Sequence, residues 1–115
     1  MSDIKIRIDT RYYRMCIHRQ ALKAIGDPEY LKFAYDPEEM QLLVEGRRID
    51  DRESVRVRYN NSGSVYVFSK PLIEGIRQVS HILLGNKTFL VEGKVRESEN
   101  IIIFSLQEAN ILSEG

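Results

Sequence analysis

Apolar and polar residues alternate in short runs along the chain, and a period of two predicts β-strands. The clearest run is residues 4–8, where Ile4, Ile6 and Ile8 alternate with charged side chains. The same rule predicts strands at residues 13–17, 31–35, 40–44, 55–59, 64–67, 88–91 and 100–106. Turn-forming residues predict reversals of the chain at residues 9–11, 36–39 and 60–63.

Two segments change to helical spacing. Ala21, Leu22 and Ile25 predict a short helix over residues 18–25, which Gly26 and Pro28 end. Ser69 can cap a second helix whose apolar stripe runs from Leu72 to Leu83 and ends at residues 85–86.

The order of these elements indicates an internal duplication. We expect an α+β, β-rich single domain of two tandem strand-strand-helix-strand-strand units, related by a pseudo-twofold axis and packed in a barrel-like way. Unit one covers about residues 4–46, a polar connector 47–53, unit two 54–106 and a tail 107–115. The units should superimpose with Leu22 on Leu72, both buried, and Ile17 on Val67.

Composition fits one domain, since 115 residues with 43% hydrophobic content can bury a substantial core. No apolar run is long enough to span a bilayer, and the first residues do not resemble a signal peptide. The single cysteine, Cys16, favours a reducing cytoplasm and is expected to be a small buried residue. We therefore predict a cytoplasmic protein with no membrane association.

The formal net charge is zero, which argues against nonspecific coating of nucleic acid. Basic residues nevertheless concentrate in residues 1–26 and 52–80, and acidic residues in 27–51. The front half of each unit is thus the basic one, although solvated surface charge of no specific function explains the pattern equally well.

The run of residues 14–22, Arg-Met-Cys-Ile-His-Arg-Gln-Ala-Leu, followed by a hairpin, resembles the AbrB/SpoVT/MraZ transition-state regulators of bacteria. The resemblance implies a swapped-hairpin barrel and DNA contacts by arginines near the strand–turn region. The motif's proline is replaced by His18 and Phe68, and only Arg14 matches its arginine. The duplicated pattern also fits a clamp-like or another pseudo-symmetric β-rich fold.

The leading hypothesis is a DNA-binding transcriptional regulator that contacts duplex DNA through an arginine-lined face. Arginine suits phosphate because its planar fork donates two hydrogen bonds at once. The expected contact residues are Arg7, Arg11, Arg14, Arg56 and Arg58, with Arg19 and Lys70 at the rim. The alternative is a protein-interaction module without nucleic-acid binding, which docks on itself as a homodimer or on another protein through complementary charges.

An enzyme is the third choice, because the sequence lacks phosphate-binding glycine loops and metal-ligand spacing. We expect no catalytic residues, no metal and no cofactor. The histidines His18 and His81 suit structural roles better than catalysis. The six tyrosines are capable of stacking on bases, but sheet packing is the commoner role of tyrosine in strands.

Overall fold

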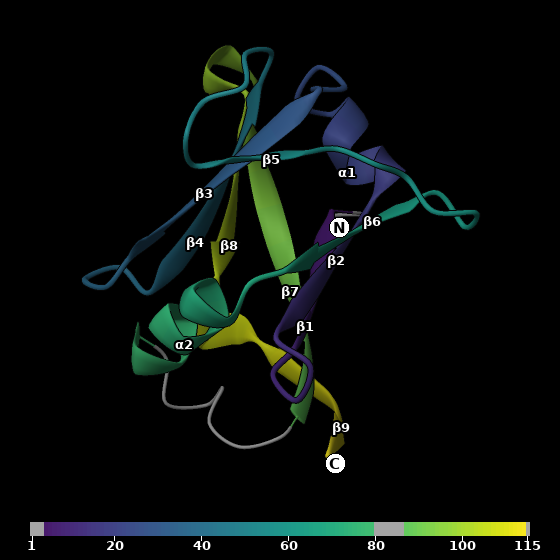
Figure 1. Ribbon diagram of the computed structural model, residues 1–115. Coiled ribbons are helices and arrows are strands. Elements are labelled where there is room, and N and C mark those ends of the chain that lie inside the picture. The colour runs from purple at the N-terminus through teal and green to yellow at the C-terminus, as the bar shows by residue number, and fades with distance from the viewer. Residues whose placement is uncertain (1–3, 80–86, 115) are drawn as a thin grey trace.

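Strands and short helices alternate along the chain, and the order strand-strand-helix-strand occurs twice (Figure 1). This computed structural model describes residues 4–79 and 87–114. In chain order the elements are β1 (Lys5–Asp9), β2 (Arg14–His18), α1 (Arg19–Lys23), β3 (Tyr30–Asp36), β4 (Gln41–Arg47), β5 (Ser54–Arg56), β6 (Ser64–Phe68), α2 (Lys70–Val79), β7 (Lys87–Arg96), η2 (Glu97–Glu99), β8 (Ile101–Ser105), η3 (Leu106–Glu108) and β9 (Asn110–Glu114).

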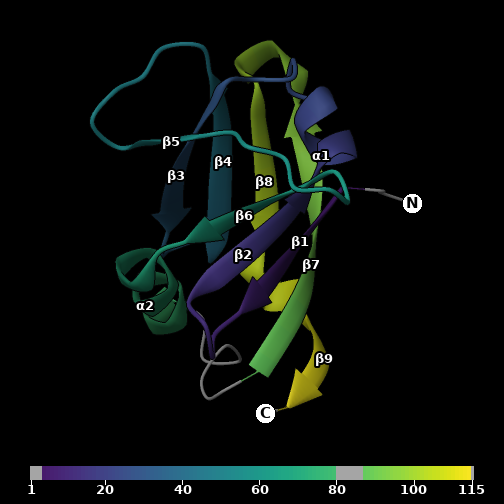
Figure 2. The same cartoon turned by 45° about the vertical axis from the view of Figure 1, so that its right-hand side comes forward.

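All nine strands of the described residues join one antiparallel sheet, which curls into a nearly closed barrel (Figures 1 and 2). Hydrogen-bonded neighbours follow the order β5-β3-β4-β8-β7-β1-β2-β6, and β9 pairs with β7 outside this path. The prediction of a β-rich single domain with a barrel-like sheet is confirmed. In the described part of the chain, no helix is long and apolar enough to cross a membrane.

The alternation along the strands fills the barrel. Ile6 and Ile8 of β1 are completely buried, while Lys5 and Arg7 between them are exposed. The same period is clear in β2, β4 and β8, and the core also contains Met15, Ile17, Leu31, Leu42, Val44, Val65, Val67, Phe89, Val91, Ile102 and Phe104. The inward side chains of opposite strands therefore share one core.

Each helix covers one end of this core. In α1, Ala21 and Leu22 are buried, and Gly26 leaves the helix with a φ of +85°, as the sequence predicts. In α2, the Ser69 hydroxyl accepts a hydrogen bond from the Leu72 N–H at 3.2 Å, so the predicted cap is confirmed. The predicted end of this second helix at residues 85–86, like His81, lies outside the described residues.

The prediction that Leu22 and Leu72 are both buried is half wrong. Leu22 is fully buried, but Leu72 is only partly buried. The inner face of α2 is formed by Ile73 and Ile76, which are fully buried. A helix turns by about 100° per residue, so the position before Ile73 faces the edge of the core.

Two predicted hairpins are confirmed, β1 with β2 and β3 with β4. The Asp36 carboxylate accepts hydrogen bonds from the N–H groups of Glu38 and Glu39 and so shapes the second turn. The predicted hairpin of residues 55–67 is wrong, because β5 pairs with β3 and β6 pairs with β2. The region assigned as a tail also contains a strand, β9.

The barrel is open between its two end strands, β5 and β6, which are not paired with each other. Both views place α2 beside the end of β6 and near β3, at the lower end of the opening (Figures 1 and 2). The opening and the neighbouring outer face of β6, β2 and β1 contain the exposed aromatic residues considered next.

Candidate functional site: an arginine–aromatic surface beside an open sheet edge

A buried aspartate organises the turn between β1 and β2. The Asp9 side chain is only 5% exposed, and its Oδ1 accepts a hydrogen bond from the Arg11 N–H at 3.0 Å. The same carboxylate lies 3.6 Å from Arg11 Nε and 3.7 Å from Arg14 Nη2. Tyr13 takes a positive φ of 52° to complete this turn. One acidic group therefore holds two arginines on the outer surface.

Aromatic rings flank these arginines. The Arg14 guanidinium carbon lies 5.4 Å from the centroid of the Tyr12 ring and 5.3 Å from that of Tyr66. The Arg11 guanidinium lies 5.3 Å from the centroid of the same Tyr12 ring. These distances are typical of cation–π contacts, which fix both the cation and the ring.

The arrangement follows from the register of β2 and β6. Arg14 lies opposite Phe68 and Cys16 lies opposite Tyr66, so the outward side chains of both strands are neighbours. The rings of Tyr66 and Phe68 stack with their centroids 6.4 Å apart. We call Arg11, Tyr12, Arg14, Tyr66 and Phe68 the arginine–aromatic surface.

These aromatic side chains are strongly exposed. Tyr12 is 59% exposed, Tyr66 41% and Phe68 67%. For Tyr12 and Tyr66 the expectation of sheet packing is therefore wrong. The sequence carries a signal for this, because Tyr66 and Phe68 alternate with the buried Val65 and Val67 and so occupy the outward positions of β6.

The other predicted contact residues lie at different distances from this surface. Arg7 and Lys5 are exposed on the outer face of β1, at a hollow of about 260 Å³ that Cys16 and His18 also line. Lys70, at the start of α2, has its Nζ 5.5 Å from the centroid of the Tyr13 ring. The structure thus brings Arg7, Arg11, Arg14 and Lys70 to the β1–β2 hairpin and the adjoining end of β6.

Arg19 belongs to another cluster, at the start of α1. Its guanidinium lies 4.6 Å from the centroid of the Tyr59 ring, and the Tyr59 hydroxyl donates a hydrogen bond to Asp27 at 3.1 Å. Burial, followed by the hydrogen bond and the negative charge of Asp27, raises the pKa of Tyr59, while Arg19 acts in the opposite direction. Arg19 therefore has a structural partner.

Arg56 and Arg58 are exposed, as the alternation predicts. Arg56 belongs to β5, on the other side of the opening from β6. Arg56 is therefore not adjacent to Lys5 and Arg7, because the opening, β6 and β2 lie between them.

An apolar groove occupies the opening. Its volume is about 570 Å³, and it is lined by Phe33, Tyr35, Glu53, Val55, Tyr66, Val67, Phe68, Ser69, Pro71 and Leu72. Glu53 is the one charged residue among them. The groove adjoins the arginine–aromatic surface, since Tyr66 and Phe68 belong to both.

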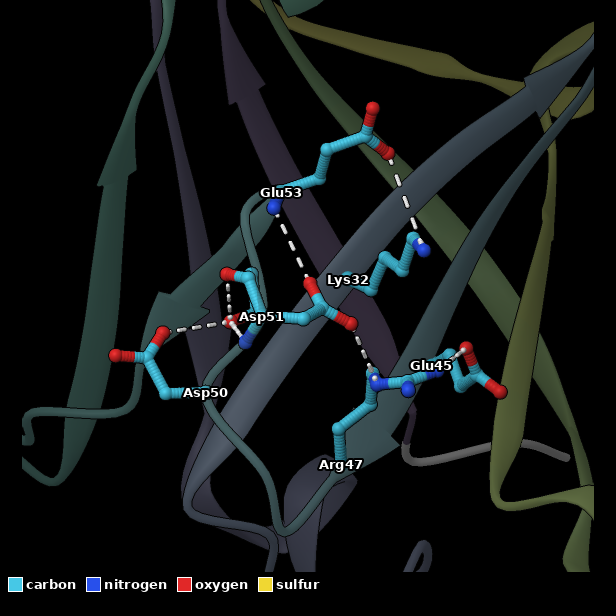
Figure 3. Close-up of polar contacts among 7 residues, drawn as sticks. Lys32, Glu45, Arg47, Asp50, Asp51 and Glu53 are labelled. Atoms are coloured by element: carbon cyan, nitrogen blue, oxygen red, sulfur yellow. Dashed lines mark hydrogen bonds and ion pairs between the residues drawn. The ribbon is translucent and has the colours of Figure 1, made fainter.

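Acidic residues before β5 are engaged in the fold (Figure 3). Asp51 accepts a hydrogen bond from the Glu53 N–H at 3.1 Å, and its Oδ2 lies 3.1 Å from Arg47 Nε in an ion pair outside hydrogen-bonding geometry. Glu53 is itself 3.9 Å from Lys32 Nζ. Among the described residues, no group of three or more His, Cys, Asp or Glu side chains is placed to hold a metal ion.

Comparisons with protein-family models, with curated proteins and with solved structures found no match, so the resemblance to AbrB-like regulators stays a prediction based on the motif at residues 14–22.

Proposed function

We propose that this protein binds nucleic acid through the outer face of β1, β2 and β6. The observation that carries the proposal is Arg14, held between the Tyr12 and Tyr66 rings and anchored by the Asp9 carboxylate. A held arginine loses less side-chain freedom when it meets a phosphate.

The charge of this face supports the proposal. Lys5, Arg7, Arg11, Arg14 and Lys70 lie on or beside it, and the Asp9 carboxylate among them is buried. Phosphates would therefore meet cations with little exposed negative charge from the turn. Release of condensed counterions would then supply much of the affinity.

The exposed rings favour contact with bases as well as with the backbone. Aromatic side chains on a basic surface can stack on unpaired bases, each stack contributing about 1–3 kcal/mol. Tyr66 and Phe68 are exposed on this surface. The regulator hypothesis predicts binding to duplex DNA through phosphate contacts. The exposed rings would instead favour single-stranded nucleic acid, whose unpaired bases can stack on them.

We also propose that the chain consists of two tandem units related by a pseudo-twofold axis. Exchanging β1–β4 with β5–β8 leaves the circular strand order unchanged, which supports this arrangement. The register of β2 and β6 supports it too, since Arg14 opposite Phe68 and His18 opposite Ser64 are related by a shift of 50 residues along the chain. A departure from symmetry is the missing pairing of β5 with β6, where the equivalent β1 and β2 form a hairpin.

Fluorescence anisotropy tests the binding proposal with two labelled probes, a duplex of random sequence and an oligothymidylate. We expect affinity at low salt that falls steeply as salt rises. The variant Arg7→Ser/Arg14→Ser should reduce the salt slope by about two for the duplex, one for each phosphate that loses its cation. A matched control, Lys94→Ser/Arg96→Ser, removes two exposed cations from the far end of β7 and should leave binding unchanged.

Absence of binding to either probe at low salt would overturn the proposal. Equal losses in the two double variants would also overturn it, because they would show that net charge matters and the β1–β2–β6 face does not.

A further inference from the structure

The outer edge of β6 has backbone groups that face the groove. In the ladder with β2, the Arg19 N–H donates to the Gly63 carbonyl at 3.0 Å and the Ser69 N–H donates to the Tyr13 carbonyl at 2.9 Å. Adjacent residues of an antiparallel strand direct their backbone groups to opposite sides. The odd-numbered residues of β6 therefore face β2, and the even-numbered residues face the groove.

Three residues of β6 point their backbone to this open side. Ser64 is satisfied by Asn60, whose side chain accepts from the Ser64 N–H at 3.0 Å and whose N–H donates to the Ser64 carbonyl at 2.8 Å. The N–H and C=O groups of Tyr66 and Phe68 remain, and in the described part of the chain no strand pairs with this side of β6. Such an edge is a template for another strand.

The opposite wall of the groove is also a strand edge. The Val57 N–H donates to the Glu29 carbonyl at 2.8 Å, so the odd-numbered residues of β3 face β5. The ladder of β5 ends at Ser54, opposite Lys32. Beyond that point the backbone of Phe33 and Tyr35 faces the opening. The groove thus lies between two unpaired stretches of strand.

The lining defines the chemistry of an occupant. Its floor and walls are apolar, and its charged residue, Glu53, has a side chain that is 74% exposed. A phosphate backbone would meet no lysine or arginine among these lining residues and would lose hydration against Phe33, Val55 and Leu72. An extended peptide matches both features, because its backbone can pair with β6 while alternate apolar side chains enter the groove.

We propose that the groove is a docking site for an extended peptide segment of a partner protein, which adds to the edge of β6. The segment has apolar residues at alternate positions and a lysine or arginine that meets Glu53. This site adjoins the nucleic-acid face and shares Tyr66 and Phe68 with it, but the proposal does not depend on nucleic-acid binding. Two-unit symmetry would place a pairing of β5 with β6 at the opening, as β1 pairs with β2. A peptide strand added to β6 would fill this gap and complete the barrel.

The test begins with a phage-displayed library of random short peptides selected on the immobilised protein. We expect enriched peptides to alternate apolar and polar residues and to contain a basic residue. Hydrogen exchange on the wild-type protein then measures the site directly. A bound peptide should slow exchange of the Tyr66 and Phe68 amides by at least about tenfold, because each gains a hydrogen-bonded partner.

Two variants of one residue separate backbone pairing from side-chain contact. Tyr66→Pro removes the N–H that faces the groove and should weaken binding by about tenfold, while a proline is tolerated at a sheet edge. Tyr66→Thr keeps the N–H, removes the ring, and should retain affinity within about threefold. Glu53→Gln should lower the affinity for the basic peptides by about threefold.

Several results would overturn the proposal. These are a library that yields no enriched peptide, enriched peptides that leave the Tyr66 and Phe68 amides unprotected, and equal affinities for the two Tyr66 variants. Protection of these amides without any peptide, together with a dimer in sedimentation equilibrium, would show that a second copy of the chain occupies the edge instead.

Discussion

Leu22 and Leu72 lie in the first turns of α1 and α2, 50 residues apart in sequence, yet Leu22 is fully buried and Leu72 lines the open groove. The difference originates in the strands around them. Leu22 is packed within the shared core, whereas Leu72 lines the groove where β5 and β6 are not paired. The surroundings of the two leucines therefore differ at the groove.

Truncation of these leucines should reflect that difference. Leu22→Ala should lower the free energy of unfolding by about 2–5 kcal/mol, because it leaves a cavity in a packed core. Leu72→Ala should cost roughly half as much, since a partly buried side chain loses less burial and its space opens to solvent. Urea denaturation of both variants measures the two losses, and equal losses would contradict the distinction.

Local patterns were sufficient to predict most of the strands. The alternation of Ile4, Ile6 and Ile8 with charged residues and the cap at Ser69 depend on neighbours in sequence, and the structure confirms both the strand and the cap. Which strands pair depends on the whole chain. Residues 55–59 alternate well, but β5 pairs with β3 over only three residues, and this partner has no local signal.

The candidate site was predictable in part for the same reason. Arg14 was identified from its motif, but its place between Tyr12 and Tyr66 depends on the register of β2 against β6. The outward direction of Tyr66 follows from alternation with Val65 and Val67. The neighbours of Tyr66 across the sheet cannot be predicted in this way, because β2 and β6 are far apart in sequence.

Burial of Tyr59, together with its hydrogen bond to Asp27, should make stability depend on pH at the alkaline end. The pKa of Tyr59 is raised above its ordinary value of 10.0, so the folded state favours the protonated phenol. This contribution is fully present below pH 10.0, the unfolded-state value, and is lost as pH rises through the higher folded-state pKa. The stability advantage of the wild type over Tyr59→Phe should therefore be level at neutral pH and shrink above about pH 10.

Chemical denaturation of both proteins across this range gives the comparison. The Tyr59→Phe variant acts as its own control for alkaline effects of the lysines, which both proteins share. An advantage that grows with pH would show that the phenolate is the favoured form in the folded protein.

Arg56 and Arg58 test how far the nucleic-acid face extends. Arg56 lies across the opening from the arginine–aromatic surface, and both arginines are exposed. If the nucleic acid also touches this side, Arg56→Ser/Arg58→Ser should weaken binding to all sequences and reduce the salt slope by about one for each phosphate that is no longer neutralised. The fold should be intact, because neither side chain is buried.

Anisotropy titrations of a random duplex at several salt concentrations provide this slope. Unchanged binding in Arg56→Ser/Arg58→Ser, with reduced binding in Arg7→Ser/Arg14→Ser, would confine the site to β1, β2 and β6.

Two glycines should respond differently to the same substitution. A Cβ at Gly93 would lie 2.6 Å from Phe104 Cε1 and 2.8 Å from Ile102 Cγ2, and both neighbours are fully buried. A Cβ at Gly75 would lie 2.8 Å from Cε1 of Tyr35, a residue that is 42% exposed and whose ring can move into solvent. Gly93→Ala should therefore destabilise the protein by about 1–3 kcal/mol through overpacking.

Gly75→Ala should cost little or nothing, because displacement of the Tyr35 ring opposes a gain of about 1 kcal/mol in helix propensity. The gain should emerge fully when Gly75→Ala is made in a Tyr35→Ala background, where no ring has to move. A thermodynamic cycle from urea denaturation isolates this coupling. If Gly75→Ala were as damaging as Gly93→Ala, the Tyr35 ring would have to be held rigidly, and the wall of the groove that it forms would be fixed before any peptide binds.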